Sequence, residues 1–135
     1  MKKFNIILVY DEKKENILMC ERKKEPYKGK LNLVGGKVEE NENELDAAYR
    51  ELYEETCITK KDICLKHLMN LQYKVQDMEL EVYVGRLNKK INVIEEVNKL
   101  IWVSKDNPFY DLDKYAGEGN IWHILHHANN YMKEI

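Results

Sequence analysis

The sequence has no long hydrophobic run. The longest apolar stretch near its start, residues 6–10, is far shorter than the roughly 20 residues of a membrane-spanning helix. Lys2 and Lys3 precede this stretch, but charged residues follow it with no small-residue cleavage site. We therefore expect no membrane segment, no membrane partner and no secretion signal, and we expect a cytoplasmic location.

Cysteine is scarce as well. The three cysteines are Cys20, Cys57 and Cys64, and no two of them form a C-x-x-C pair. An odd count without such pairs argues against a disulfide framework and against a structural zinc site. We expect small buried or half-buried thiols in a reducing compartment.

The chain also lacks a strong net charge, because 22 basic residues nearly balance 24 acidic ones. This average hides a cluster. Residues 39–55 contain eight acids and a single base, Arg50, and so carry −7, whereas the rest of the chain carries +5. A local group of acids in an otherwise basic chain suggests a cation site and argues against a nucleic-acid surface.

The remaining pattern predicts one domain, residues 1–135, of the α/β class, since the length leaves little room for a second domain. Strands are expected at residues 4–10, 17–20, 31–34, 64–75, 80–87 and 100–103. The second strand is expected to form a hairpin with the first, and Gly35–Gly36 to end the third. Helices are expected at 44–56 and 121–133, the latter with Ile121, Leu125, Ala128 and Met132 on one side.

The first helix gathers carboxylates on one edge. At about 100° per residue, Glu51, Glu54 and Glu55 share one arc with Glu44. The neighbouring arc is suited to packing on a sheet and holds Leu45, Ala48, Leu52 and Thr56. Like charges at these spacings destabilise a helix, and a bound divalent cation would reverse that effect. An ordinary solvated acidic face, with Arg50 and Glu54 as a surface ion pair, is the alternative.

The ligand type indicates which cation would bind. Carboxylates and carbonyls are hard oxygen donors that suit Mg²⁺, Mn²⁺ or Ca²⁺ and not Zn²⁺. Mg²⁺ commonly shares its coordination shell with substrate phosphates. The basic loop at residues 22–30 supports phosphate chemistry, because its cations could attract a polyphosphate: Arg22, Lys23, Lys24, Lys28 and Lys30.

The spacing around this helix resembles the Nudix box of the MutT/Nudix hydrolases, G-x5-E-x7-R-E-U-x-E-E-x-G-U, where U is a bulky aliphatic residue. Gly36 is followed after five residues by Glu42, and after seven more by the run from Arg50 to Ile58. Eight of nine fixed or class positions match. The exception is Cys57, where the family has glycine. Glycine after a helix usually adopts the left-handed conformation, which costs a cysteine about 1 kcal/mol.

The resemblance implies an α/β/α sandwich, with a mixed sheet between the box helix and the C-terminal helix, and a Mg²⁺ or Mn²⁺ cofactor. The implied metal ligands are the carboxylates of Glu51, Glu54 and Glu55 and the carbonyl of Gly35. Glu51 or Glu55 would also orient or deprotonate the attacking water. Arg50 would hold a helix carboxylate in place, and Glu42 would support the site electrostatically. A later loop carboxylate, Glu95 or preferably Glu96, would join the metals, unless the two are a solvated pair in a turn.

Substrate contacts follow from a narrower resemblance to the oxidised-purine nucleoside triphosphatases of the family. There an asparagine three residues before the first glycine touches the base, and Asn32 matches that position. An asparagine bonded to backbone at a strand edge is the alternative. The other expected substrate contacts are Lys23, Lys37, Tyr115 and Glu118, with Asn120 and Trp122 nearby. The acidic purine-contacting residues of that group have no clear match here.

Two further aromatic and histidine features have plainer interpretations. We expect Trp102 to be a core residue. His123, His126 and His127 have a spacing that could bind a metal, but the sequence positions no carboxylate beside them.

The resemblance implies Mg²⁺-dependent hydrolysis of a nucleoside triphosphate, such as 8-oxo-dGTP, to monophosphate and pyrophosphate by attack of water on phosphorus. The alternative substrate is another nucleoside diphosphate derivative, such as a nucleotide sugar. A non-catalytic nucleotide-binding module would usually have lost box carboxylates, and all four are present. An acidic metal-buffering surface is a further alternative. The expected partner is a small nucleotide and no nucleic-acid polymer, and the protein is expected to be a monomer or homodimer.

Overall fold

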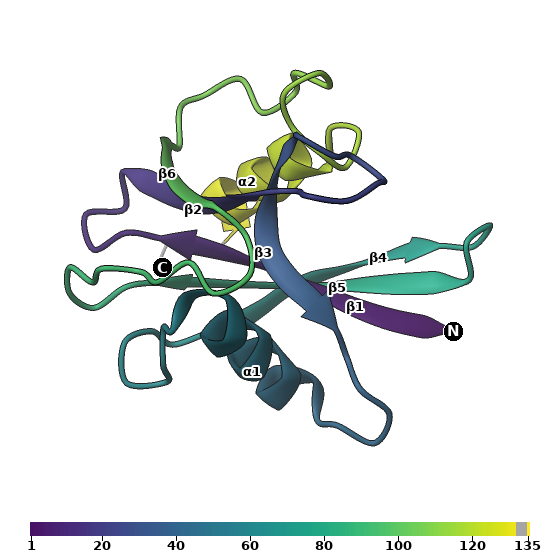
Figure 1. Cartoon of the computed structure of the whole chain (residues 1–135), viewed down its shortest axis with the longest axis horizontal. Coiled ribbons are helices and arrows are strands. Elements are labelled where there is room, and N and C mark those ends of the chain that lie inside the picture. Colours follow the sequence, from purple (N-terminus) through teal and green to yellow (C-terminus); the bar gives the residue numbers. More distant parts are fainter. Residues whose placement is uncertain (132–134) are drawn as a thin grey trace.

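The computed structural model describes residues 1–131 and 135, and these form a mixed six-stranded sheet between two helices. The strands lie in the order β4-β5-β1-β3-β2-β6. They are β1 (Lys2–Tyr10), β2 (Asn16–Glu21), β3 (Leu31–Lys37), β4 (Lys66–Tyr73), β5 (Met78–Arg86) and β6 (Leu100–Ser104). Helix α1 (Glu44–Thr56) covers one face of the sheet and α2 (Asn120–Tyr131) covers the other (Figure 1). The predicted α/β sandwich is confirmed.

Strand β1 lies inside the sheet because both of its faces are apolar. Ile7 and Val9 pack in the core under α1, whereas Leu8 and Tyr10 pack in the core under α2. β1 pairs in parallel with β5 along its whole length. A strand buried on both faces reads as a continuous apolar run, which is why the sequence predicts it well.

The predicted hairpin of β1 and β2 is wrong for most of the two strands. They pair only at Tyr10 and Ile17. β3 lies between them and is antiparallel to both, and β2 uses its other edge to pair with β6. In this position β3 buries Leu33 in the core under α2 and Val34 in the core under α1.

Strand β3 also continues through its two glycines to Lys37, so the prediction that they end the strand is wrong. Gly36 is the ladder partner of Asn5, and Gly35 is the partner of Ile6. A Cβ atom on Gly35 would lie 2.1 Å from the carbonyl oxygen of Asn5. Glycine is therefore needed here for the close approach of β3 to β1.

Helix α1 spans the predicted residues. It begins after Asn43, whose Oδ1 accepts hydrogen bonds from the backbone N–H groups of Leu45 (3.0 Å) and Asp46 (3.1 Å). This is the usual way in which an N-cap satisfies free donors of a first turn. Ala48 and Leu52 pack on the sheet as predicted, but Leu45 is 39% exposed.

The three cysteines are free thiols in different surroundings. Cys20 is buried and Cys57 is half-buried, as expected, but Cys64, in the extended segment before β4, is exposed. Cys57 caps the end of α1 in the left-handed conformation, with a φ of 64°. It therefore adopts the conformation for which the family box has glycine.

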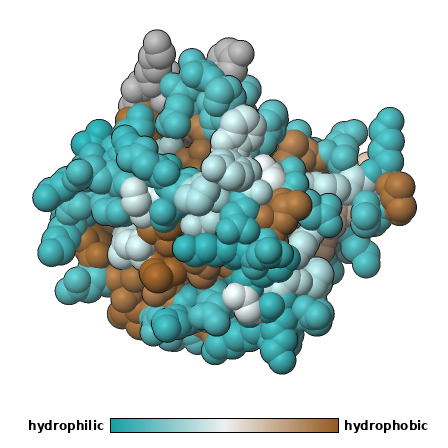
Figure 2. Space-filling model, turned by 90° about the horizontal axis from the view of Figure 1, so that it is seen from above, coloured by the Kyte–Doolittle hydropathy of each residue, from teal (hydrophilic) through white to brown (hydrophobic). Residues whose placement is uncertain are grey.

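Helix α2 packs its apolar side on the sheet. Ile121, Leu125 and Ala128 are buried as predicted, whereas Met132 lies outside the described residues. Within the described part of the chain, no helix is long and apolar enough to cross a membrane. Figure 2 shows hydrophilic side chains over much of the face seen from above, with smaller hydrophobic areas between them.

Candidate active site

The end of β3 meets the carboxylate side of α1 at Gly35 and Gly36, which we call the glycine edge. A Cβ atom on Gly36 would lie 2.3 Å from a carboxylate oxygen of Glu51. The backbone N–H of Gly35 donates a hydrogen bond to the Glu55 carboxylate. The structure thus brings together three of the predicted site residues, Gly35, Glu51 and Glu55.

Glu55 is a buried carboxylate, although the sequence pattern predicts it on an open helix edge. It is 8% exposed, and its Oε2 atom has no hydrogen-bond partner among the described residues. Burial, with a smaller contribution from the nearby Glu51 carboxylate, raises the pKa of Glu55 to about 7, although the Gly35 N–H opposes this shift. Burial also raises the pKa of Glu51. A cation beside Glu51 and Glu55 would stabilise the ionised form of both carboxylates.

Arg50 ties the loop before α1 to the helix. Its Nε donates to Glu42 Oε2 at 2.6 Å and its Nη2 donates to Glu42 Oε1 at 2.9 Å, which is a bidentate pair. Its Nη1 lies 3.1 Å from Glu51 Oε1 and 3.2 Å from Glu54 Oε2. Nη2 also donates to the Lys37 carbonyl at 3.0 Å. The guanidinium holds the pKa of Glu42 below its usual range.

The predicted metal ligands are neighbours but do not form a ready-made metal site. In the part of the chain that the structure describes, no group of three or more His, Cys, Asp or Glu side chains is arranged to hold a metal ion. Glu54 is 53% exposed and turns toward Arg50. The Arg50 guanidinium therefore takes the place of a cation between Glu51 and Glu54.

The two loop candidates lie beyond the C-terminal end of α1. The Glu96 carboxylate is 3.6 Å from the Sγ atom of Cys57. Glu95 instead accepts a hydrogen bond from the backbone N–H of Leu100 at 2.6 Å, which fixes the start of β6. Each carboxylate thus accepts one hydrogen bond, that of Glu96 from the weakly donating Cys57 thiol, and Glu96 stays a candidate ligand.

The predicted substrate residues do not converge on one place. Asn32 Oδ1 accepts from the backbone N–H of Leu33 at 2.8 Å, in line with the backbone-bonded alternative. Tyr115 is 1% exposed and packs against Phe109, with ring centroids 4.8 Å apart, so its ring offers no open face. Lys23 donates to the Val97 carbonyl at 2.9 Å. The Lys37 side chain is exposed beside the glycine edge.

Glu118 belongs to a polar group that sequence reasoning missed. Its exposed carboxylate accepts a hydrogen bond from the Tyr27 hydroxyl. Burial raises the pKa of the Tyr73 phenol, and the nearby Glu118 carboxylate adds to this shift. The Tyr73 hydroxyl in turn accepts a hydrogen bond from Asn120 Nδ2. We call these four residues, Tyr27, Tyr73, Glu118 and Asn120, the tyrosine cluster. They come from three distant segments, so no local spacing could have revealed them.

The C-terminal aromatic and histidine residues form surface contacts. Trp122 stacks on His126 with ring planes 9° apart, and His126 contacts the side-chain amide of Asn130 at 3.0 Å. His126 is therefore engaged within α2.

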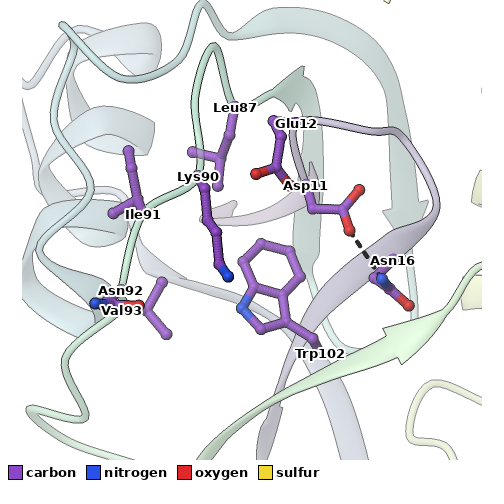
Figure 3. Close-up of a pocket in the computed structure, with 9 residues that line it drawn as sticks. All are labelled: Asp11, Glu12, Asn16, Leu87, Lys90, Ile91, Asn92, Val93 and Trp102. Carbon is purple, nitrogen blue, oxygen red and sulfur yellow. Dashed lines mark hydrogen bonds between the residues drawn. The ribbon is translucent and has the colours of Figure 1, made fainter.

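A separate cavity of about 410 Å³ lies between the β1–β2 turn, the 87–93 segment and β6. Figure 3 shows the Lys90 side chain pointing toward the ring of Trp102, with Asp11 bonded to Asn16 on another wall. Trp102 is half-buried: it packs against the core under α1, as predicted, and also lines this cavity. None of the box carboxylates lines it.

Comparisons with known proteins agree with this architecture. The family model described as the NUDIX domain matches residues 2–119. A C. elegans Ap4A hydrolase has 18% identity and a TM-score of 0.77, covering 98% of this chain and 99% of that one. A MutT/nudix family protein from Enterococcus faecalis has 20% identity and a TM-score of 0.63, covering 75% and 42%.

A third similar structure is the bifunctional NMN adenylyltransferase/ADP ribose pyrophosphatase from Francisella tularensis, complexed with AMP and a manganese ion. It has 22% identity and a TM-score of 0.71, covering 91% of this chain and 39% of that one. The chain thus spans less than half of the E. faecalis and F. tularensis chains. A search of curated proteins found no match.

The matched residues 2–119 make up most of the chain, which therefore belongs to the Nudix family. The resemblance of the sequence to the MutT/Nudix family is confirmed. The similar structures reported above share its fold at identities below 25%. The oxidised-purine type stays a prediction.

Proposed function

We propose that this protein is a pyrophosphohydrolase of a small nucleotide and that it depends on a divalent metal. The observation that carries the proposal is the buried Glu55 carboxylate, which bonds the glycine edge and leaves Oε2 without a partner among the described residues. A buried ionised carboxylate is costly unless a proton or cation compensates it. The raised pKa of Glu51 beside it points the same way.

The available donors fit Mg²⁺ or Mn²⁺. The carboxylates of Glu51, Glu54 and Glu55 and the carbonyl of Gly35 would hold the ion, and Glu96 is the candidate from the loop. All are hard oxygen donors. A bound ion would neutralise phosphate charge and lower the pKa of water. The unpartnered Oε2 of Glu55 and the absence of a side chain at the glycine edge favour this assignment.

The protein's own residues position and exchange protons. Glu51 or Glu55 would orient the attacking water or accept its proton. The water oxygen then bonds to phosphorus while the bond to the leaving phosphate oxygen breaks. Arg50 keeps Glu42, Glu51 and Glu54 on one side of the helix and so sets their orientation.

For the substrate, we propose a nucleoside triphosphate that yields monophosphate and pyrophosphate, with 8-oxo-dGTP as one candidate. The tyrosine cluster offers phenol, carboxylate and amide groups to a nucleoside. The basic loop that carries Tyr27 also carries Lys24 and Lys28, which can attract phosphates.

Another nucleoside diphosphate derivative is the second candidate substrate. The Asn32 side-chain oxygen already accepts a hydrogen bond from the backbone, and the Tyr115 ring is buried. Two side chains that we expect to contact an oxidised purine are therefore not available to a ligand in this way. Enzymes named for Ap4A and for ADP ribose are among the similar structures. For both candidates we propose that the partner is a small nucleotide. We also propose that the protein is cytoplasmic and that it is a monomer or a homodimer.

The test is product analysis on a panel of dGTP, 8-oxo-dGTP, Ap4A, ADP ribose and a nucleotide sugar, each with Mg²⁺, with Mn²⁺ or with a chelator. We expect metal-dependent release of a mononucleotide from at least one of them. Incorporation of ¹⁸O from labelled water identifies the phosphorus that is attacked. No turnover of any compound with either metal would contradict the proposal.

Glu54→Gln is the matched variant. We expect it to keep the fold and to lose about two or more orders of magnitude in turnover, since a carboxylate ligand becomes a neutral amide. Glu40→Gln, at an exposed acid in the loop before α1, is the control and should turn over normally. Circular dichroism checks the fold of both. Turnover of Glu54→Gln at the wild-type rate would remove Glu54 from the site.

A further inference from the structure

A polar side chain interrupts the apolar face of β1 under α1. Asn5 is 1% exposed, and its Oδ1 accepts a hydrogen bond from the backbone N–H of Gly36 at 3.0 Å. Gly36 is also the ladder partner of Asn5. A side chain thus supplies the acceptor for this N–H group, and a buried N–H left without one would be costly.

This hydrogen bond lies at the glycine edge. The space next to Gly36 is filled by the Glu51 carboxylate, and the neighbouring Gly35 offers its N–H to Glu55. The position of Gly36 therefore limits where the Glu51 carboxylate can lie. The Gly36 N–H belongs to the Gly35–Gly36 peptide, so its carbonyl partner on Gly35 is oriented by the bond to Asn5.

The register partner of Asn5 on β5 is a second buried polar residue, Glu81. It is 0% exposed, and its Oε2 accepts from the Tyr83 hydroxyl at 3.2 Å. Glu81 also shares a hydrogen bond with Glu44 at the start of α1, and Glu44 pairs with Lys3 at 2.5 Å. The Glu81 carboxyl is thus held in a fixed place under α1.

Each of these two residues has one buried atom without a partner among the described residues: Nδ2 of Asn5 and Oε1 of Glu81. The two atoms do not bond each other, but the first can only donate and the second can accept, so one ordered water between them would satisfy both. A turned Asn5 amide would direct NH₂ at the Gly36 N–H, which sets one donor against another. An acceptor on the Glu81 side favours the orientation that the Gly36 N–H needs.

We propose that Asn5 is a positioning residue for the glycine edge and that Glu81 fixes the orientation of its amide. The proposal rests on the proposed function, in which the glycine edge is part of the metal site. Asn5 acts on the chemistry through the Gly35–Gly36 peptide. Glu81 acts one residue further away.

The test compares pairs of variants of similar shape. Asn5→Leu removes the acceptor, whereas Asn5→Asp keeps an oxygen in the place of Oδ1. Glu81→Leu removes the second acceptor, whereas Glu81→Gln keeps an amide oxygen. Ile7→Ala, at a buried position on the same face of β1, controls for general destabilisation.

Two readouts are used. The first is hydrogen exchange and the ¹H–¹⁵N shift of the Gly36 amide, measured without metal or substrate. The second is Mn²⁺ affinity by electron paramagnetic resonance. We expect Asn5→Leu to expose the Gly36 amide to exchange and to weaken Mn²⁺ binding about 10–100-fold, as for outer-shell partners of metal ligands. Asn5→Asp should keep the amide protected, and Ile7→Ala should leave Mn²⁺ affinity unchanged.

For Glu81, we expect Glu81→Leu to shift the Gly36 resonance toward its position in Asn5→Leu, and Glu81→Gln to restore it. A Gly36 amide equally protected in wild type and Asn5→Leu would overturn the role of Asn5. Equal shifts in Glu81→Leu and Glu81→Gln would overturn the role of Glu81. If the wild type bound no Mn²⁺, the proposed function would fail, but the metal-free amide data would still decide the positioning role.

Discussion

The buried acid Glu81 makes a specific prediction about how stability depends on pH. Burial raises the pKa of Glu81, and the Glu44 carboxylate raises it further, whereas the Tyr83 hydroxyl and Lys3 act in the opposite direction. The folded protein therefore binds this proton more tightly than the unfolded chain does. The resulting stabilisation is complete below the unfolded-state pKa of 4.5 and is lost as the pH rises through the folded-state pKa.

The magnitude follows from linkage. Each pKa unit between the folded and unfolded states corresponds to about 1.4 kcal/mol. Glutamine at position 81 has no proton to lose and keeps one carbonyl oxygen as an acceptor. We therefore expect Glu81→Gln to gain about 1–3 kcal/mol of unfolding free energy relative to wild type between pH 5 and pH 8.

The measurement is urea denaturation of both proteins at pH 5 and pH 8, with the exposed Glu40→Gln as control. The gain is the difference in unfolding free energy between variant and wild type at pH 8, minus the same difference at pH 5. Groups that titrate identically in both proteins therefore cancel. Glu44 does not cancel, because its pKa is lowered by Lys3 and also by its hydrogen bond to Glu81, so the measured change belongs to the Glu44–Glu81 pair. An equal difference at both pH values, or a relative loss for the variant at pH 8, would refute the reasoning.

Three further predictions concern α1 and the glycine edge. Cys57→Gly should raise the melting temperature by about 2–5 °C, because Cys57 has a left-handed backbone conformation that glycine adopts without strain. Cys57→Ala keeps a Cβ atom and should not raise it. Calorimetry measures both, and a lower melting temperature for Cys57→Gly would contradict the prediction. Gly36→Ala should stay folded but lose most turnover, because the new Cβ displaces the Glu51 carboxylate; wild-type turnover would show that Glu51 can move without effect. Asn43→Ala should lose about 1 kcal/mol of unfolding free energy, because alanine has no oxygen to cap the helix. Asn43→Ser keeps such an oxygen and should lose much less. Equal losses in the denaturation curves of the two variants would argue against the cap.

Local patterns predicted α1 well, because its limits depend on neighbouring residues. The spacing of Ala48 and Leu52 is visible in the sequence, and the helix in the structure has the predicted bounds. The strands were predicted less well because their partners are distant. Nothing near Ile17 indicates that β3 lies between β1 and β2, and nothing near Gly35 indicates the close approach of Asn5.

The candidate site shows the same division. The box residues were found from spacing, and the structure places Glu51 and Glu55 at the glycine edge. The burial of Glu55 could not be predicted, since it depends on how deeply α1 packs. Asn5 and Glu81 do interrupt apolar strands in the sequence, but only the pairing of β1 with β5 brings them side by side.

Arg50 has a consequence for how an ion would enter this site. Glu51 and Glu54 already have a positive neighbour, so a divalent ion held by them, as we propose, would compete with the guanidinium for those carboxylates. The affinity of the site for the ion would then be reduced by the free energy of the ion pairs that Arg50 gives up. Arg50 would keep its bidentate bond to Glu42, and its Nη1 would be free to donate to phosphate oxygens.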